Sequence, residues 1–278
     1  MKRVMSIQDL SCLGKCSLSV ALPIISSAGI ETCVIPTAIL STHTRFDNVH
    51  FKDLSYEMLP IGSHWEKEGF EFDCISSGYL GNKKQVDNVI KLIGTFKKEK
   101  TIVIVDPAMA DNGKLYSGID KDFPLEIKRL CTKADIILPN KTEGCLLTDT
   151  PYKEDMSVEK IQDILIKLSA YGPKYAVITG VELSDKSYGF MGYDSLNKEF
   201  FSYGTKKINY KTSGTGDIFT SAFIGAYMNE YSVYESLRIA ADYTSACIEN
   251  TFNDPDRIDY GTNFEKEIPY YIELLNKH

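Results

Sequence analysis

Several common features are missing from this 278-residue sequence, and each absence excludes a class of protein. No stretch approaches the ~18 to 20 consecutive apolar residues that a membrane-spanning helix needs. The N-terminal residues lack the apolar core of a secretory signal peptide. Positive charge is in deficit, with a net charge of −7, whereas a general nucleic-acid-binding protein needs a basic face. We therefore expect neither a membrane nor a nucleic acid as a partner.

The seven cysteines follow no metal-binding or disulfide pattern. Their number is odd, they are spread along the chain, and no paired Cys-x-x-Cys occurs. This spacing argues against a zinc site. Several cysteines lie in apolar runs, where a reduced, buried thiol is the ordinary state. We therefore expect a protein of the reducing cytoplasm.

Three catalytic motifs are also missing. The chain has no Gly-x4-Gly-Lys-Ser/Thr segment, which excludes a P-loop kinase, and no Gly-x-Gly-x-x-Gly after the first strand, which disfavours a dinucleotide enzyme. No Gly-x-Ser-x-Gly elbow supports a hydrolase triad around the Ser-Thr-His-Thr stretch. His43 stands alone there, so we interpret it as a hydrogen-bonding loop residue rather than a metal ligand.

The pattern that is present predicts an α/β protein. Short β-branched runs of about five residues alternate with amphipathic segments of about 10 to 15 residues, which is typical of βαβ units in a mostly parallel sheet covered by helices on both faces. No repeat and no Pro-, Gly- or Ser-rich linker interrupts it, so we expect one domain over residues 1–278. The expected strands are 4–7, 32–40, 72–76, 101–105, 135–138 and 175–178, followed by a hairpin of 188–193 and 199–203. The expected helices are 16–28, 53–68, 85–97, 124–131, 142–147, 158–168, 218–227, 233–250 and 268–275.

One glycine-rich turn carries the main chemical signal. Gly214-Thr-Gly-Asp217 precedes an apolar helical pattern, and both glycines permit a tight turn with positive φ. A helix that begins at such a turn aims unpaired N–H groups at one point, which suits a phosphate. Asp217 would then accept a proton from a hydroxyl that attacks this phosphate. The alternative is an ordinary turn capped into a helix.

Other polar residues follow the predicted strands, where parallel α/β sheets bind ligands. Asn140 and Glu143 stand at a strand-to-helix turn, and Glu143 could hold Mg²⁺ directly or through water. The alternative is a capping box formed by the same two residues. Asp106 ends a β-branched strand before Pro107. It is either a residue of the site or an ordinary cap or turn residue.

Seven short segments together resemble a known family. They are Ile7-Gln8, Ser41-Thr-His-Thr44, Ser77-Gly-Tyr-Leu-Gly81, Asp106-Pro-Ala-Met109, Gly113-Lys-Leu-Tyr116, Ala134-Asp-Ile-Ile-Leu-Pro-Asn-Lys-Thr-Glu143 and Gly214-Thr-Gly-Asp217. In this order and spacing, over nearly the whole chain, they resemble the pyridoxal kinases of the ribokinase-like superfamily, especially the bacterial pyridoxamine/pyridoxal kinase branch. The resemblance implies a three-layer α/β/α sandwich.

The resemblance also implies roles for residues. It implies a base that deprotonates the 5′-hydroxyl of vitamin B6, an anion hole, a magnesium–phosphate pair, nucleotide contacts and ring contacts. The base corresponds to Asp217, the anion hole to Gly214, Thr215 and Gly216, and the magnesium–phosphate pair to Asn140 and Glu143. The nucleotide contacts correspond to Asp106, Tyr116, Thr179 and Gly180, and the ring contacts to Asp9, Thr44 and Tyr79. ATP, Mg²⁺, often a monovalent cation such as K⁺, and commonly a homodimer belong to the same expectation.

The chain departs from the family pattern at three positions. Asp9 stands where relatives usually have Ser, Leu10 where they often have His, and Arg45 where they have a small or neutral residue. An Asp after Ile-Gln is similar to the hydroxymethylpyrimidine kinases, which share the fold. A hydroxymethylpyrimidine kinase of thiamine synthesis is therefore one alternative to a vitamin B6 kinase. A non-catalytic protein that binds pyridoxal phosphate is another, although it would have no need of Asp217 beside an anion hole.

Overall fold

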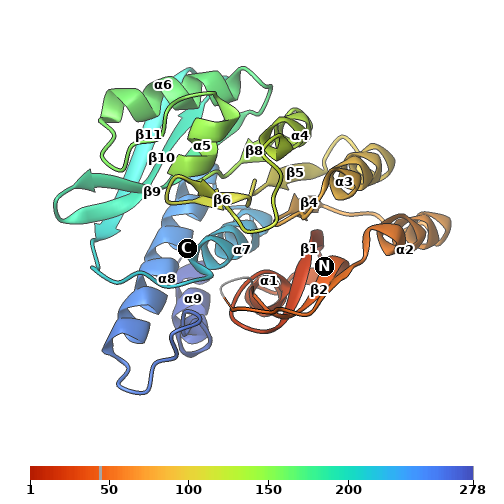
Figure 1. The fold of residues 1–278 in the computed structure, drawn as a ribbon, viewed down its shortest axis with the longest axis horizontal. Helices are drawn as coiled ribbons and strands as arrows, with labels where there is room; N and C mark the ends of the chain where they lie inside the picture. Colours follow the sequence, from red (N-terminus) through yellow and green to blue (C-terminus); the bar gives the residue numbers. More distant parts are fainter. Residues whose placement is uncertain (44–45, 278) are drawn as a thin grey trace.

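A single nine-stranded sheet runs through the computed structural model, which describes residues 1–43 and 46–277 (Figure 1). Its strand order is β11-β10-β9-β8-β5-β4-β1-β2-β3. The five pairings from β9 to β2 are parallel, whereas β3, β10 and β11 pair antiparallel at the two edges. The strands are β1 (Arg3–Leu13), β2 (Glu31–Thr42), β3 (Phe51–Asp53), β4 (Cys74–Ser77), β5 (Ile102–Val105), β8 (Ile136–Ile137), β9 (Tyr175–Ser184), β10 (Ser187–Asp194) and β11 (Glu199–Lys206), with a separate pair β6 (Ala110–Asp111) and β7 (Lys114–Leu115).

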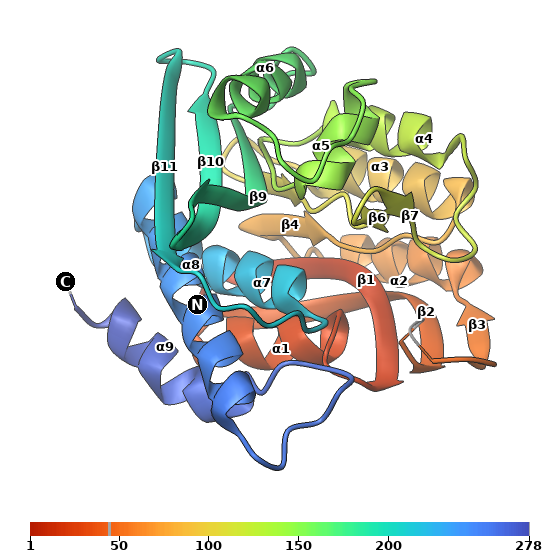
Figure 2. The same ribbon diagram turned by 60° about the vertical axis from the view of Figure 1, so that its left-hand side comes forward.

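Helices cover both faces of this sheet. They are α1 (Leu18–Ser27), α2 (Ser55–Lys67), α3 (Lys83–Phe96), α4 (Phe123–Cys131), α5 (Lys141–Leu147), α6 (Val158–Ser169), α7 (Thr215–Met228), α8 (Val233–Asn253), a 3-10 turn η1 (Glu265–Glu267) and α9 (Ile268–Leu275). Helices α2 to α6 form one outer layer, and α1, α7, α8 and α9 form the other (Figure 2). The expected three-layer sandwich is confirmed.

The two cores follow from the two-residue period of the strands. Val4 packs with the layer of α1 and α7, whereas Met5, the next residue, packs with the layer of α2 and α3. Ile104 and Val105 divide in the same way. Because successive side chains of a strand point to opposite faces, a strand buried on both sides is apolar throughout. The continuous apolar runs that indicated buried strands are thereby explained.

Several strands differ from the prediction. Strand β1 does not end at Ile7 but continues to Leu13, because it pairs with β2 on both sides of an irregularity between Gln8 and Leu10. Strand β2 passes through Pro36 without a break. The range 108–120, where no strand was predicted, contains the short β6–β7 pair, and β3 was not predicted at all. Strands of two or three residues are too short to carry a periodic signal.

The sheet direction places the site. The carboxyl ends of the parallel strands lie on the same side of the sheet, and the loops that follow them meet the N-terminal end of α7 there (Figure 2). Among residues 1–43 and 46–277, none of the helices has both the length and the apolar composition needed to cross a membrane.

Candidate active site

In the glycine turn before α7, Gly214 has the predicted positive φ and Gly216 does not. Gly214 has a φ of 82°, and an added Cβ would lie 1.9 Å from the carbonyl oxygen of Lys15. Both facts require glycine at this position. Gly216 instead belongs to the first turn of α7 and has no positive φ, which corrects the expectation for that residue. The first intrahelical bond runs from the Ile218 N–H to the Gly214 carbonyl at 3.0 Å, so the preceding N–H groups are free of helical partners.

Asp217 lies in the first turn of α7, beside these N–H groups. Burial raises the pKa of its carboxyl to about 7. A hydrogen-bonding interaction with the Ser17 backbone N–H opposes this rise, whereas the negative charges of Asp106 and Asp9 add to it. A carboxylate with a pKa near neutrality is a stronger base than an ordinary aspartate, so it is suited to take a proton from a hydroxyl.

Asp106 comes directly after β5 and reaches the same helix. Its Oδ2 accepts a hydrogen bond of 2.8 Å from the Thr220 hydroxyl, and burial raises its pKa to about 6. This contact is not a cap or a turn bond, because Thr220 lies within α7 and not in a turn after β5. Asp106 and Asp217 line one enclosed hollow together with Gln8 and Ser77. The sheet therefore brings two acids from distant parts of the chain together.

Asn140 and Glu143 form the capping box that was the alternative to a metal site. The Asn140 Oδ1 accepts from the Glu143 N–H at 3.0 Å, and the Glu143 Oε2 accepts from the Asn140 N–H at 2.8 Å. The Glu143 Oε1 also accepts from the N–H groups of Met109 and Ala110, at 3.1 and 3.4 Å. Burial and the nearby Asp106 raise the pKa of Glu143 well above its usual value. The capping role is thus present, and it holds Glu143 near Asp106.

This acidic pair fits a divalent cation, although no dense ligand cluster surrounds it. In the described part of the chain, no three His, Cys, Asp or Glu side chains gather closely enough to hold a metal ion by themselves. Magnesium keeps several waters and binds proteins through one or two carboxylates plus substrate phosphates. A cation between Asp106 and Glu143 would relieve the repulsion that raises the pKa of Glu143.

Two tyrosines connect the acids to the neighbouring strand end. Tyr116 and Tyr79 have ring centroids 6.4 Å apart. Burial raises the pKa of Tyr116, and the carboxylates of Glu143, Asp106 and Asp217 raise it further. Burial raises the pKa of Tyr79 as well, with an added contribution from Asp9. The expected nucleotide-side tyrosine and the expected ring-side tyrosine are therefore neighbours.

Asp9 lies within β1 rather than at its end, which corrects the predicted position. It occupies the irregularity between Gln8 and Leu10, and its side chain is buried. Its Oδ1 accepts from the Ser17 hydroxyl at 2.5 Å, and its Oδ2 accepts from the Ser11 hydroxyl at 3.2 Å. Burial raises the pKa of Asp9, while these two hydroxyls oppose the rise. The charge of Asp9 contributes to the raised pKa of both Asp217 and Tyr79, so Asp9 lies near each of them.

The remaining predicted residues divide into two groups. Thr179 and Gly180 do not end a strand, since β9 continues to Ser184, but Thr179 bridges to Asn140 beside the capping box. Gly180 has a φ of 69°, and an added Cβ would lie 3.0 Å from the Tyr188 hydroxyl. Thr44, and the departure at Arg45, lie outside the described residues.

Sequence reasoning missed the segment before α1. The Lys15 carbonyl lies close to Gly214, the Ser17 hydroxyl donates to Asp9, and the Ser17 backbone N–H opposes the rise in the pKa of Asp217. Cys16 is also near both acids, whose charges add to the burial that raises its pKa to about 12. No motif marks these residues, since Lys15 and Ser17 approach Gly214 and Asp217 from about 200 positions earlier in the chain. His43 is a hydrogen-bonding residue as expected, with its Nε2 2.7 Å from the Tyr260 carbonyl oxygen.

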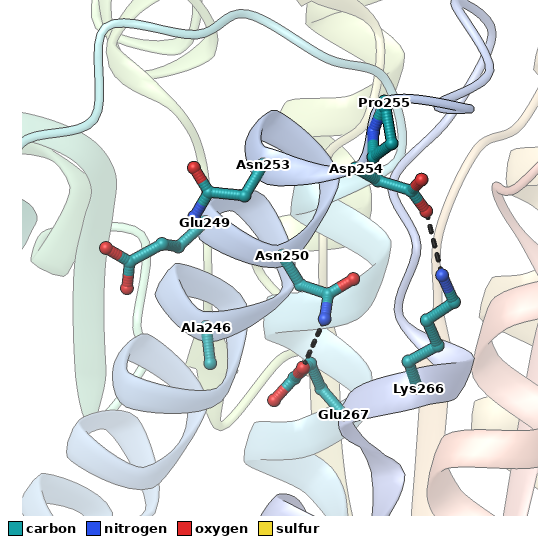
Figure 3. A pocket seen from close by; sticks show the side chains of 8 residues that line it. All are labelled: Ala246, Glu249, Asn250, Asn253, Asp254, Pro255, Lys266 and Glu267. Atoms are coloured by element: carbon teal, nitrogen blue, oxygen red, sulfur yellow. Dashed lines mark hydrogen bonds and ion pairs between the residues drawn. The ribbon is translucent and has the colours of Figure 1, made fainter.

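A second, wider hollow on the surface is not part of this site. It lies between the end of α8 and η1, and two hydrogen-bonded pairs of side chains line it (Figure 3). Lys266 bonds Asp254 at 2.8 Å, and Asn250 bonds Glu267 at 2.9 Å. None of the predicted site residues lines it.

Phosphoryl transfer to a hydroxyl needs an anion cradle next to a base. The first turn of α7 places a buried acid, Asp217, beside N–H groups that have no helical partner. On a three-layer α/β sandwich, this combination defines a small-molecule kinase. The chain belongs to the phosphomethylpyrimidine kinase family, whose model matches residues 22–258.

Individual relatives add detail. A solved structure with pyridoxal, from a Bacteroides thetaiotaomicron protein assigned to the phosphomethylpyrimidine kinases, is 34% identical, with a TM-score of 0.93 over 98% of this chain and 96% of that one. The pyridoxal kinase of Lactobacillus plantarum is 27% identical, with a TM-score of 0.91 over 100% and 99%. The pyridoxal kinase of Dictyostelium discoideum is 25% identical over 97% of this chain and 91% of its own. The resemblance to pyridoxal kinases is confirmed.

Proposed function

We propose that this protein is an ATP-dependent kinase that phosphorylates the 5′-hydroxymethyl group of a vitamin B6 vitamer: pyridoxal, pyridoxine or pyridoxamine. The observation that carries the proposal is Asp217, a carboxylate with a pKa of about 7 next to the N–H groups of the Gly214 turn. Support comes from the family and from the similarity to two pyridoxal kinases and to a protein solved with pyridoxal.

The reaction follows from this geometry. The N–H groups of Gly214, Thr215 and Gly216 hold the γ-phosphoryl group of ATP, and Asp217 faces the 5′-hydroxyl. As the hydroxyl oxygen forms a bond to phosphorus, its proton passes to Asp217 and the bond from phosphorus to the β-phosphate oxygen breaks. ADP leaves with its electron pair. Positioning and charge stabilisation provide most of the rate enhancement in such transfers.

A separate set of residues would hold the metal and the nucleotide. Asp106, Asn140 and Glu143 would hold Mg²⁺ through its waters, since the oxygens of Glu143 already accept backbone hydrogen bonds. The ion supplies positive charge that neutralises the phosphates. Tyr116, Thr179 and Gly180 would line the nucleotide phosphates. A K⁺ requirement, a homodimer, a cytoplasmic location and one domain over residues 1–278 complete the proposal.

Asp9 favours a second candidate substrate, hydroxymethylpyrimidine. An ionised carboxylate accepts hydrogen bonds and cannot donate. It would therefore favour a ring that presents a donor: the phenol or protonated nitrogen of a pyridine, or the amino group of a pyrimidine. The family description itself names a pyrimidine kinase, which makes this comparison necessary.

A coupled assay of ADP release tests the proposal. Pyridoxal, pyridoxine, pyridoxamine and hydroxymethylpyrimidine are compared with ATP and Mg²⁺ present, and Asp217→Asn serves as the inactive control. We expect the highest kcat/KM with a vitamin B6 vitamer. A higher value for hydroxymethylpyrimidine would establish the second candidate, and no ADP release with any of the four would contradict both.

A further inference from the structure

Ser17, directly before α1, has an unusual backbone. Its φ is 52° and its ψ is −134°, a conformation in which a residue with a Cβ is strained and glycine is not. Six non-glycine residues of the described chain have a positive φ. Five of them are exposed, and Ser17 alone is buried, at 6% exposure. A strained, buried residue persists only where its surroundings hold it, and such residues cluster at functional sites.

The hydroxyl of Ser17 is used in an atypical way. Ser17 is the N-cap of α1, where a serine side chain ordinarily accepts a hydrogen bond from the first helical turn. Here it makes no capping bond. Its hydroxyl instead donates to the Oδ1 of Asp9 at 2.5 Å. The helix start is therefore left without its side-chain cap, and the hydroxyl serves a buried carboxylate.

The backbone of the same residue faces the second carboxylate. The Ser17 N–H interacts with Asp217 and favours its ionised form. The adjacent chain is fixed by the close approach of the Lys15 carbonyl to Gly214, and the Ser17 carbonyl accepts from the N–H groups of Val20 and Ala21 at 3.0 and 2.9 Å. These contacts hold the backbone of Ser17 in place, and with it the N–H and the hydroxyl.

We propose that Ser17 is a positioning residue whose hydroxyl holds Asp9 in a fixed place near Asp217. The inference rests on the proposed function, in which Asp9 contacts the ring of the vitamer and Asp217 deprotonates its 5′-hydroxyl. Glycine would adopt the same backbone without strain, but it has no group to hold Asp9. The serine is therefore retained for its hydroxyl.

The effect of removing the hydroxyl is specific. In Ser17→Gly the N–H still faces Asp217, so the base is preserved. Asp9 keeps only the longer bond from Ser11, at 3.2 Å, and its buried carboxylate loses a hydrogen bond that favours its charged form. We expect the KM for pyridoxal to rise about tenfold, the scale of one charge-assisted hydrogen bond, with kcat changed less than about threefold and the KM for ATP unchanged.

The test compares Ser17→Gly with Ser19→Ala and with a double-mutant cycle. Ser19 is a matched control, because its hydroxyl lies two residues further on and bonds only the backbone carbonyls of Gly14 and Cys16, at 3.0 and 2.7 Å. We expect Ser19→Ala to keep the parent KM. If Ser17 acts through Asp9, then Ser17→Gly has no further effect on KM in an Asp9→Asn background.

Three results would overturn the inference: an unchanged KM in Ser17→Gly, an equal rise in Ser19→Ala, or an additive effect in the Asp9→Asn background. Pyridoxal affinity is also measured by calorimetry for parent and variants, so that the inference is tested even if the parent releases no ADP. In that case the proposed function fails while the Ser17–Asp9 coupling is judged by binding alone. Thermal melting verifies that each variant is folded.

Discussion

Replacement of Asp217 by Asn tests the chemistry most directly. The amide keeps the size of the side chain and leaves the N–H groups of the Gly214 turn in place, but it cannot accept the hydroxyl proton. A positioned general base contributes about 10²- to 10⁴-fold. We therefore expect kcat to fall by about 10² to 10⁴, while the KM for ATP stays within about threefold of the parent.

The raised pKa of Asp217 adds a signature in pH. Only the ionised form is a base, so the parent rate should rise with pH through about 7 and level off above it. At pH 8 about nine-tenths of the carboxyls would be ionised, and at pH 6 about one-tenth. Asp217→Asn should lose this acidic limb, because the titrating group is gone.

The raised pKa of Asp217 also predicts that stability falls with rising pH, whereas the rate increases. A carboxyl whose folded pKa is raised from 3.8 to about 7 favours the folded state at low pH, and this contribution is lost as pH rises through the folded value. The parent should therefore lose stability between about pH 4 and pH 7, and Asp217→Asn should melt at a higher temperature than the parent at pH 8. This difference should vanish near pH 4.

Steady-state kinetics from pH 5.5 to 9 and melting curves from pH 4 to 9 provide the two measurements. Asp163→Asn is the matched control, since Asp163 is exposed on α6 and does not line the hollow that contains Asp217. The assignment of Asp217 as the base would be refuted by a loss of rate below tenfold, or by an acidic limb that persists unchanged in the variant.

Three further predictions address the metal, the ring and the turn. Glu143→Gln should raise the magnesium concentration needed for half-maximal rate, and overlaying titrations of variant and parent would leave Glu143 with its capping role alone. Asp9→Ser should change the ratio of kcat/KM between pyridoxal and hydroxymethylpyrimidine by about tenfold or more, since one charge-assisted hydrogen bond is worth roughly 1.5 to 3 kcal/mol; a ratio within about twofold of the parent would show that Asp9 does not contact the ring. Gly214→Ala should lower the free energy of unfolding by about 1 to 3 kcal/mol or more, because its Cβ meets the Lys15 carbonyl and its φ is positive; a denaturant melt equal to the parent's would contradict the turn geometry.

Local features of this protein were determined by the sequence alone. Apolar runs that are buried on both faces, separated by amphipathic helices, are enough to predict a parallel α/β sandwich, because the periods of strand and helix are written into neighbouring residues. The turn at Gly214 and the acid in the first turn of α7 are local as well. The capping box of Asn140 and Glu143 is also local, because the spacing of these two residues was enough to predict it as an alternative.

Contacts between distant segments were decided only by the tertiary structure. Asp9 was expected at a strand end, yet pairing with β2 carries β1 past it and leaves it buried between two serine hydroxyls. The positive φ of Ser17 is found together with its hydrogen bond to Asp9, and no property of a serine in a sequence indicates it. The raised pKa values of Asp106 and Asp217 have the same origin. Burial is a property of the packed chain, so the chemistry of an acid becomes known only when the residues that exclude water from it are in place.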